Sequence, residues 1–205
     1  MGRKAVLIEA SAVPGQDPLP GAARDVDTLK SWLMSNPGGA WEEDEIEILR
    51  NPTVNLVRAH MVFARSTDYA FISFSGHGCH PNEGDFDDTE VALYDGCLRV
   101  YELNCGAARC GVVIDACRYV GPESFVESYQ RAVGGVKLAR DRTWEAHRQM
   151  FDSAVAAADK GVVYLFSCDI TEFAGESPLT GGYFTRYLEP VIDLRVGFLG
   201  VFTRM

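Results

Sequence analysis

The sequence predicts an α/β fold in which a mostly parallel central sheet carries helices on both faces. Two observations predict it. Short apolar runs alternate along the chain with segments whose apolar residues recur at helical spacing, and most of these runs are continuously apolar, as in strands buried on both faces. The chain has 205 residues, which suits one core, so we expect a single domain over residues 1–205.

Five apolar runs are the expected strands of the central sheet. They cover residues 4–9, 45–49, 68–75, 111–116 and 161–167. Two further strands, at 91–94 and 98–101, flank Asp95-Gly96, a dipeptide that favours a tight hairpin turn.

Three segments have the apolar periodicity of amphipathic helices. The first starts near residue 22 and ends before the turn sequence at 36–39, and Pro52 is expected at the start of the second. The third covers 144–158. The expected core-facing residues are Ala22, Val26, Leu29 and Leu33 in the first, Val54, Val57 and Met61 in the second, and Trp144, Phe151 and Val155 in the third.

The charge balance limits the possible partners. With 19 basic and 29 acidic residues the net charge is -10, which argues against binding of nucleic acid or an anionic membrane, because both need clustered Lys and Arg. Basic ligands or peptides fit better.

Residues 1–10 lack the apolar stretch of a signal peptide, and no run reaches the roughly 18 residues that span a bilayer, so we expect a cytoplasmic protein.

The six cysteines are expected to be free thiols. Disulfide frameworks belong mainly to small secreted domains, and nothing in the sequence indicates secretion. The spacings also lack the CxxC pairs of a zinc site. The cysteines are Cys79, Cys97, Cys105, Cys110, Cys117 and Cys168.

Two apolar runs end in reactive side chains. FISFSGHGCH at 71–80 contains His77, and GVVIDACRYV at 111–120 contains Cys117. Ligands of parallel sheets gather beyond the carboxyl ends of the strands, so we expect the two side chains to meet there. A thiolate is a strong nucleophile, an imidazole can carry its proton, and the Gly78 and Cys117 N–H groups can hold an oxyanion. The alternative is a structural His and an unreactive buried Cys.

The two motifs together resemble the signatures of caspase-like cysteine peptidases. SGHG at 75–78 and DACR at 115–118 stand 40 residues apart, counted from His to Cys. The acidic residue two positions before the cysteine is similar to that of metacaspases and bacterial orthocaspases. KAVLIEA, LPGAARDVDTL and GGYFTRYL resemble the first strand, first helix and late helix of the same fold. The resemblance thus spans nearly the whole chain.

The resemblance implies a cysteine endopeptidase of the metacaspase type with His77 and Cys117 as its dyad. It also implies an acidic specificity pocket built from Asp115 and Asp25. Two carboxylates in one pocket would select Arg or Lys in a protein or peptide substrate. The alternative for Asp25 is a helix-start residue that complements the helix dipole.

Calcium is the one candidate cofactor that the resemblance implies. Many metacaspases need it, and Glu83, Asp85, Asp87 and Asp88 form an acidic loop with suitable oxygen ligands. No EF-hand pattern is present, however. The alternative is a solvated turn, in which case no metal or cofactor is expected.

The segment at 118–160 lies where caspase-like enzymes carry the linker between their large and small catalytic parts. Activation is expected to occur by self-cleavage after Arg140 or Arg142 or by binding of a protein partner. Residues 118–121 (RYVG) depart from the family pattern, so we expect the rim of the site to have its own chemistry. Residues 169–178 are expected to form a wall of the cleft.

Three functions remain open from the sequence. The first is an active endopeptidase with Arg or Lys specificity. The second is a catalytically idle caspase-like module that serves as an adaptor or regulated scaffold, because a fold alone does not establish activity. The third is the same peptidase working only within a signalling or defence complex.

Overall fold

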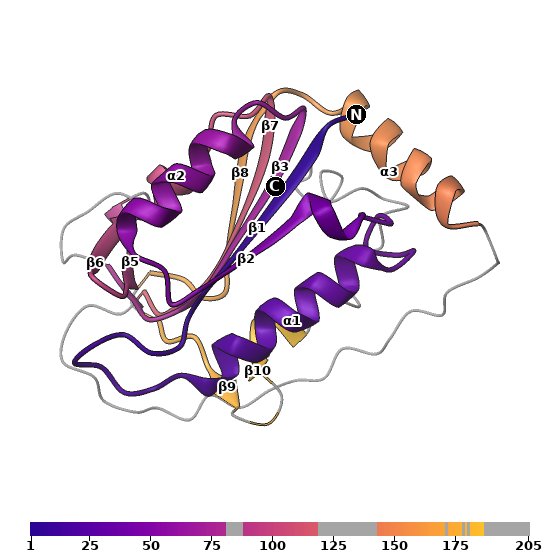
Figure 1. Cartoon of the computed structure of the whole chain (residues 1–205). Coiled ribbons are helices and arrows are strands. Elements are labelled where there is room, and N and C mark those ends of the chain that lie inside the picture. The colour runs from indigo at the N-terminus through magenta and orange to yellow at the C-terminus, as the bar shows by residue number, and fades with distance from the viewer. Residues whose placement is uncertain (81–87, 119–142, 171, 178, 180, 187–205) are drawn as a thin grey trace.

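A computed structural model describes residues 1–80, 88–118, 143–170, 172–177, 179 and 181–186 of the chain. Its centre is a five-stranded sheet with the order β2-β1-β3-β7-β8, in which every neighbouring pair is parallel (Figure 1). The predicted α/β class is therefore confirmed. The strands are β1 (Arg3–Ala10), β2 (Ile46–Arg50), β3 (Tyr69–Gly76), β7 (Arg109–Asp115) and β8 (Gly161–Phe166).

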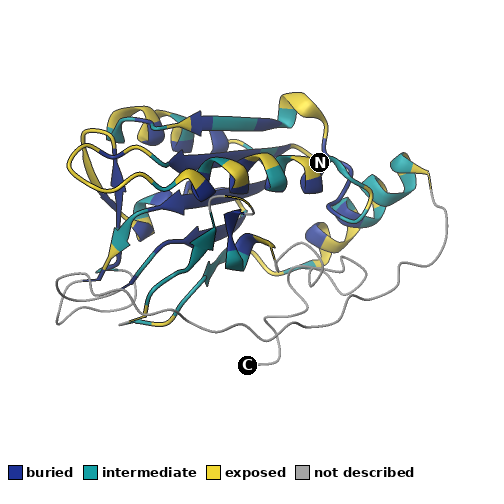
Figure 2. Cartoon of the chain, turned by 90° about the horizontal axis from the view of Figure 1, so that it is seen from below, coloured by how far each residue is buried: buried dark blue, intermediate teal, exposed yellow. Residues whose placement is uncertain are grey.

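Helices cover both faces of this sheet. Figure 1 shows α1 (Pro20–Met34) and α3 (Trp144–Ala157) on one side and α2 (Val54–Ala64) on the other. Strand β1 explains the two layers, because Leu7 packs in one apolar cluster with α1 and α3, whereas Ile8 packs in the other with α2. Alternate side chains of a strand point to opposite faces, so a continuously apolar strand has a core on each side. Figure 2 shows buried strands at the centre of the fold, and β1 and β3 are buried at every position except Lys4.

Smaller elements lie around the central sheet. A three-stranded antiparallel sheet contains β4 (Gly78–Cys79), β5 (Glu90–Leu93) and β6 (Gly96–Arg99). A short hairpin joins β9 (Glu176–Ser177) to β10 (Gly181–Gly182). Two 3₁₀ helices, η1 (Glu43–Glu45) and η3 (Val100–Leu103), complete the described elements.

Several predicted boundaries were wrong. The hairpin turn is formed by residues 94–95, since Gly96 already pairs with Leu93, and the second strand ends at Arg99 because 100–103 form η3. Helix α2 begins at Val54, where the Thr53 side chain accepts a hydrogen bond from the Leu56 N–H, so Pro52 precedes the cap.

Trp144 was also wrongly expected to face the core. Phe151 and Val155 of α3 are buried, but Trp144 is only half-buried. The Arg148 guanidinium lies 5.5 Å from its ring centroid, so Trp144 packs against a neighbouring cation of the same helix.

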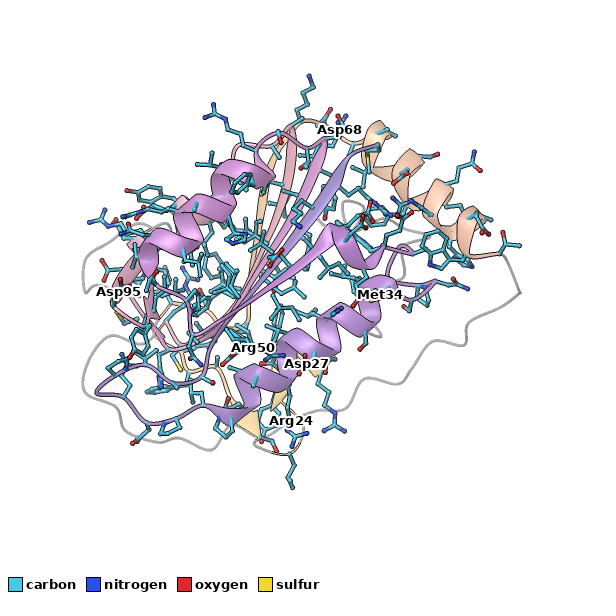
Figure 3. All side chains as sticks on the ribbon, in the orientation of Figure 1. Arg24, Asp27, Met34, Arg50, Asp68 and Asp95 are labelled. Carbon is cyan, nitrogen blue, oxygen red and sulfur yellow. The ribbon has the colours of Figure 1, made fainter. Side chains whose placement is uncertain are left out.

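Polar contacts connect the helices to the sheet edges. Figure 3 shows Asp27 of α1 beside Arg50 at the end of β2, and their side chains form a 2.7 Å ion pair.

Among the described residues, no helix is long and apolar enough to cross a membrane.

The register of β3 and β7 brings the two motifs to the same edge. Ser75 lies opposite Asp115, one residue before β3 ends and at the last residue of β7. His77 follows two residues after Ser75, and Cys117 follows two residues after Asp115. The expected meeting of the two motifs beyond neighbouring strand ends therefore has a structural basis.

Candidate active site

His77 leaves the end of β3 as a half-buried side chain whose ring is held by the backbone. Its Nε2 atom lies 2.7 Å from the carbonyl oxygen of Asp17, in the loop between β1 and α1. A carbonyl oxygen can only accept, so Nε2 carries the hydrogen. The neutral imidazole then has Nδ1 as its unprotonated nitrogen, which is the atom that can take a proton.

The backbone at Gly78 lies directly against the Cys117 segment. A Cβ atom at Gly78 would come within 2.8 Å of both the Ala116 Cβ and the Cys117 carbonyl oxygen. Real Cβ atoms essentially never approach this closely, so the close packing of the two motifs needs a glycine here. The two motifs, which are distant in sequence, are thus in contact through Gly78.

Cys117 is half-buried and its thiol points toward the segment that follows β8. Its Sγ donates to the Ala174 carbonyl oxygen over 3.6 Å, and the Arg118 N–H donates to the Glu172 carbonyl oxygen over 3.0 Å. Residues 172–174 therefore lie beside Cys117, where a wall of the cleft was expected.

A second thiol lies near Cys117. Burial, and to a smaller extent the neighbouring Cys117, raise the pKa of Cys168 to about 11. Its Sγ donates to the Ala116 carbonyl oxygen over 3.3 Å. Cys168 therefore stays protonated near neutral pH and is a poor nucleophile. All six cysteines are free, as predicted.

Asp25, the predicted pocket residue of α1, is buried. Its Oδ2 accepts a 2.6 Å hydrogen bond from the Ser75 hydroxyl, and its Oδ1 accepts a 2.7 Å bond from the Gly182 N–H. Burial and, to a smaller extent, the nearby Asp115 raise the pKa of Asp25 to about 7. The two hydrogen bonds favour the charged carboxylate and so limit this rise. Its position in the second turn of α1, turned toward the sheet, does not fit a simple dipole-complementing surface residue.

Asp115, the second predicted pocket residue, is buried beside Asp25. Its Oδ2 accepts a 2.9 Å hydrogen bond from the Thr185 hydroxyl and a 3.3 Å bond from the Thr185 N–H. Burial raises the pKa of Asp115, and the Thr185 hydrogen bond lowers it. In the described part of the chain, neither aspartate forms an ion pair with Lys or Arg.

Arg118 was expected to belong to the rim of the site, but its side chain is buried. Its Nε donates to the Thr89 hydroxyl over 3.1 Å, and its guanidinium lies 4.0 Å from the Phe166 ring centroid. His80, also buried, contacts the same hydroxyl through Nδ1 at 3.0 Å. Arg118 therefore connects the segment after β7 to the residue that precedes β5 and to β8 inside the protein.

Some predicted residues cannot be placed. The calcium candidates Asp85 and Asp87, with Glu83, lie outside the described residues, as do Arg140 and Arg142. Asp88 is described and its carboxylate pairs with Arg99 at 3.2 Å. Within the described residues, no group of three or more His, Cys, Asp or Glu side chains is arranged to hold a metal ion.

The family model of the caspase domain matches residues 2–196. The chain belongs to the caspase domain family. No curated protein sequence matches it. Among solved structures, it is similar to caspase-1 from Spodoptera frugiperda, with a TM-score of 0.57 and 15% sequence identity over 95% of this chain and 68% of that chain. At this identity the likeness shows the fold alone.

Membership of the family confirms the resemblance inferred from the motifs at 75–78 and 115–118 and makes this caspase-domain protein a cysteine endopeptidase. Sequence patterns assign no site role to Ser75, Thr185 or Gly182, and they place Glu176 only within the expected wall at 169–178, yet all four contact the acidic pair or adjoin it. Ser75 and the segment at 181–188 belong to recognisable motifs, but only tertiary contacts reveal what these residues touch.

Proposed function

We propose that this caspase-domain protein cleaves peptide bonds after Arg or Lys, with His77 and Cys117 as its catalytic dyad. The observation that carries the specificity is the pair of buried carboxylates, Asp25 and Asp115, which has no basic partner among the described residues. A buried carboxylate pair is costly unless a cation joins it, so this arrangement favours a positively charged side chain from outside.

The dyad chemistry follows from the bonding of His77. With Nε2–H donating to the Asp17 carbonyl, Nδ1 takes the Cys117 proton, and the thiolate attacks the scissile carbonyl carbon. The Sγ–C bond forms, the C–N bond breaks, and the same nitrogen returns the proton to the leaving amine. Water then hydrolyses the thioester.

The oxyanion of the tetrahedral intermediate needs backbone donors. The N–H groups of Gly78 and Cys117 are the candidates, and the close packing at Gly78 supports this role because it brings the two segments together. The substrate cation would meet Asp25 and Asp115, whose partners at present are the neutral donors Ser75, Gly182 and Thr185.

Fluorogenic peptides ending in Arg, Lys or Asp test this function. We expect the native chain to cleave after Arg and Lys, Cys117→Ala to abolish cleavage, and Cys168→Ala, which removes the neighbouring thiol, to retain it. Cleavage after Asp would refute the acidic pocket. Absence of cleavage, together with no labelling of Cys117 by a thiol-reactive Arg peptide, would favour the idle scaffold.

The same assay decides the part that calcium plays. Each peptide is measured with added calcium and with a chelator. An increase in cleavage with calcium would support a metal-binding role for the acidic residues at 83–88, whereas equal rates would count against one.

A further inference from the structure

Glu176 contributes a third carboxylate to the neighbourhood of the acidic pair. It is the first residue of β9 and is half-buried. Its Oε2 atom lies against Gly21 so closely that a Cβ there would be 2.5 Å from it. Burial raises the pKa of Glu176, whereas the backbone N–H groups of Gly21 and Ala22 stabilise its charged form and lower it.

The N-terminus of α1 has no side-chain cap of its own, although the Ala22 N–H donates to the Leu19 carbonyl oxygen over 3.1 Å. Its N-cap is Leu19, which makes no side-chain hydrogen bond, and the first turn contains no acidic residue. Helix N-termini are stabilised by side-chain acceptors and by negative charge. Glu176 places a carboxylate against this helix start from a segment more than 150 residues away in the sequence.

The strand paired with Glu176 lies on the two buried aspartates. Gly182 is opposite Glu176 in the β9–β10 hairpin, and its N–H is the donor to Asp25 Oδ1. A Cβ at Gly182 would be 2.3 Å from Asp115 Oδ2 and 2.9 Å from Asp25 Oδ2. Gly182 therefore packs directly against both carboxylates, and a larger residue would not fit there.

The hairpin is thus held on both of its strands. Figure 1 shows β9 and β10 beside the N-terminal end of α1. On one strand Glu176 contacts the helix start, and on the other strand Gly182 contacts Asp25, one turn further along the same helix.

We propose that Glu176 is a positioning residue of the acidic pocket: it caps α1 from a distance and holds the β9–β10 hairpin so that Gly182 fixes Asp25 and Asp115. Glu176 acts through Gly182 and Asp25, not by contact with the reacting atoms. The link to substrate affinity rests on the proposed Arg or Lys specificity, whereas the placement of the hairpin does not.

Amide hydrogen exchange of the full chain tests the placement without any substrate. In Glu176→Ala, we expect exchange at the Gly182 amide to rise about tenfold, the size of effect that loss of a helix cap gives, and in Glu176→Gln to rise less. Glu145→Gln is the matched control, because Glu145 is exposed in the first turn of α3, at a distance from the site. Unchanged protection of Gly182 in Glu176→Ala would overturn the proposal.

Kinetics on the same variants distinguish positioning from general destabilisation. We expect Glu176→Ala to raise KM for an Arg peptide about tenfold with kcat changed less than about threefold, and Cys117 labelling to proceed as in the native chain. A fall in kcat with unchanged KM would count against the proposal. If the native chain cleaves no basic peptide, the specificity proposed above fails, and the exchange result alone decides the role of Glu176.

Discussion

Ser75 donates a 2.6 Å hydrogen bond to Asp25, although the two residues are 50 positions apart. The bond connects the carboxyl end of β3 to the second turn of α1, and Asp115 stands opposite Ser75 on β7. One serine thus touches one carboxylate and neighbours the other. Because His77 and Cys117 follow these strand ends by two residues, the acidic pair and the candidate dyad share one framework.

We expect Asp25→Asn to make the protein more stable at pH 8 and to abolish cleavage after Arg. Burial raises the pKa of Asp25 from 3.8 to about 7, so the folded protein keeps a proton that the unfolded chain releases. The stability contribution of Asp25 therefore falls as the pH rises between these values, by roughly 4 kcal/mol at most. Asn removes this penalty but also the charge.

Thermal unfolding at pH 8 checks the stability part of this prediction. Asp27→Asn is the control on the same helix, because Asp27 is exposed and its surface ion pair with Arg50 is worth about 1 kcal/mol or less. A lower melting temperature for Asp25→Asn than for the native chain would mean that Asp25 is ionised and stabilising.

The affinity for an Arg peptide should depend on pH through Asp25. Above about pH 7 the Asp25 carboxylate is charged and attracts the guanidinium, and below it the proton returns, so KM should rise by up to tenfold per pH unit on the acidic side. A peptide with citrulline, the uncharged isostere of Arg, provides the comparison. The same step in both KM profiles would assign the titration to a group other than the pocket.

Thr185→Val should remove a hydrogen bond to Asp115 and lower the free energy of unfolding, whereas Thr185→Ser should keep both. The Thr185 hydroxyl is the donor of a buried 2.9 Å bond to Asp115, and Val leaves that oxygen with only the longer backbone bond. A lost buried hydrogen bond costs about 1–3 kcal/mol. Denaturant unfolding measures the loss, and equal stability of the Val and Ser variants would show that the hydroxyl contributes nothing.

Gly78→Ala should separate the two motifs. The added Cβ would come within 2.8 Å of the Ala116 Cβ and the Cys117 carbonyl oxygen, so the backbone must move. We expect kcat to fall on the order of 10²-fold, as for a lost oxyanion donor. Overpacking should also lower the free energy of unfolding by about 1–3 kcal/mol. At Gly96 the nearest atom would be 3.6 Å away, so Gly96→Ala serves as the tolerated control. Full activity of Gly78→Ala would remove Gly78 from the oxyanion site.

Iodoacetamide at neutral pH should modify Cys117 before Cys168. Burial raises the pKa of Cys168 to about 11, which keeps it a thiol, whereas Cys117 has the imidazole of His77 as its proposed base. Peptide mass spectrometry of a time course gives the order, and His77→Ala should slow only the Cys117 reaction. Faster modification of Cys168 would contradict the assignment of the nucleophile.

The amino-acid sequence by itself determined the layers of this protein and the place of its chemistry. Continuously apolar segments such as β1 and β3 need a core on both faces, and this requires a parallel sheet with helices on each side. In such a sheet, residues that follow strand ends meet at one edge. These rules are local or depend only on pattern, so they predicted the fold and the adjacency of the motifs containing His77 and Cys117.

Only the tertiary structure decided what each site residue touches. Thr185 and Gly182 contact Asp115 and Asp25 across 70 and 157 residues, and no periodicity or spacing indicates such pairs. The inward turn of Arg118 toward Phe166 likewise depends on packing between strands and not on local pattern. Burial and long-range hydrogen bonds set the pKa of Asp25, because both are properties of the assembled core and not of the segment that carries the carboxyl group.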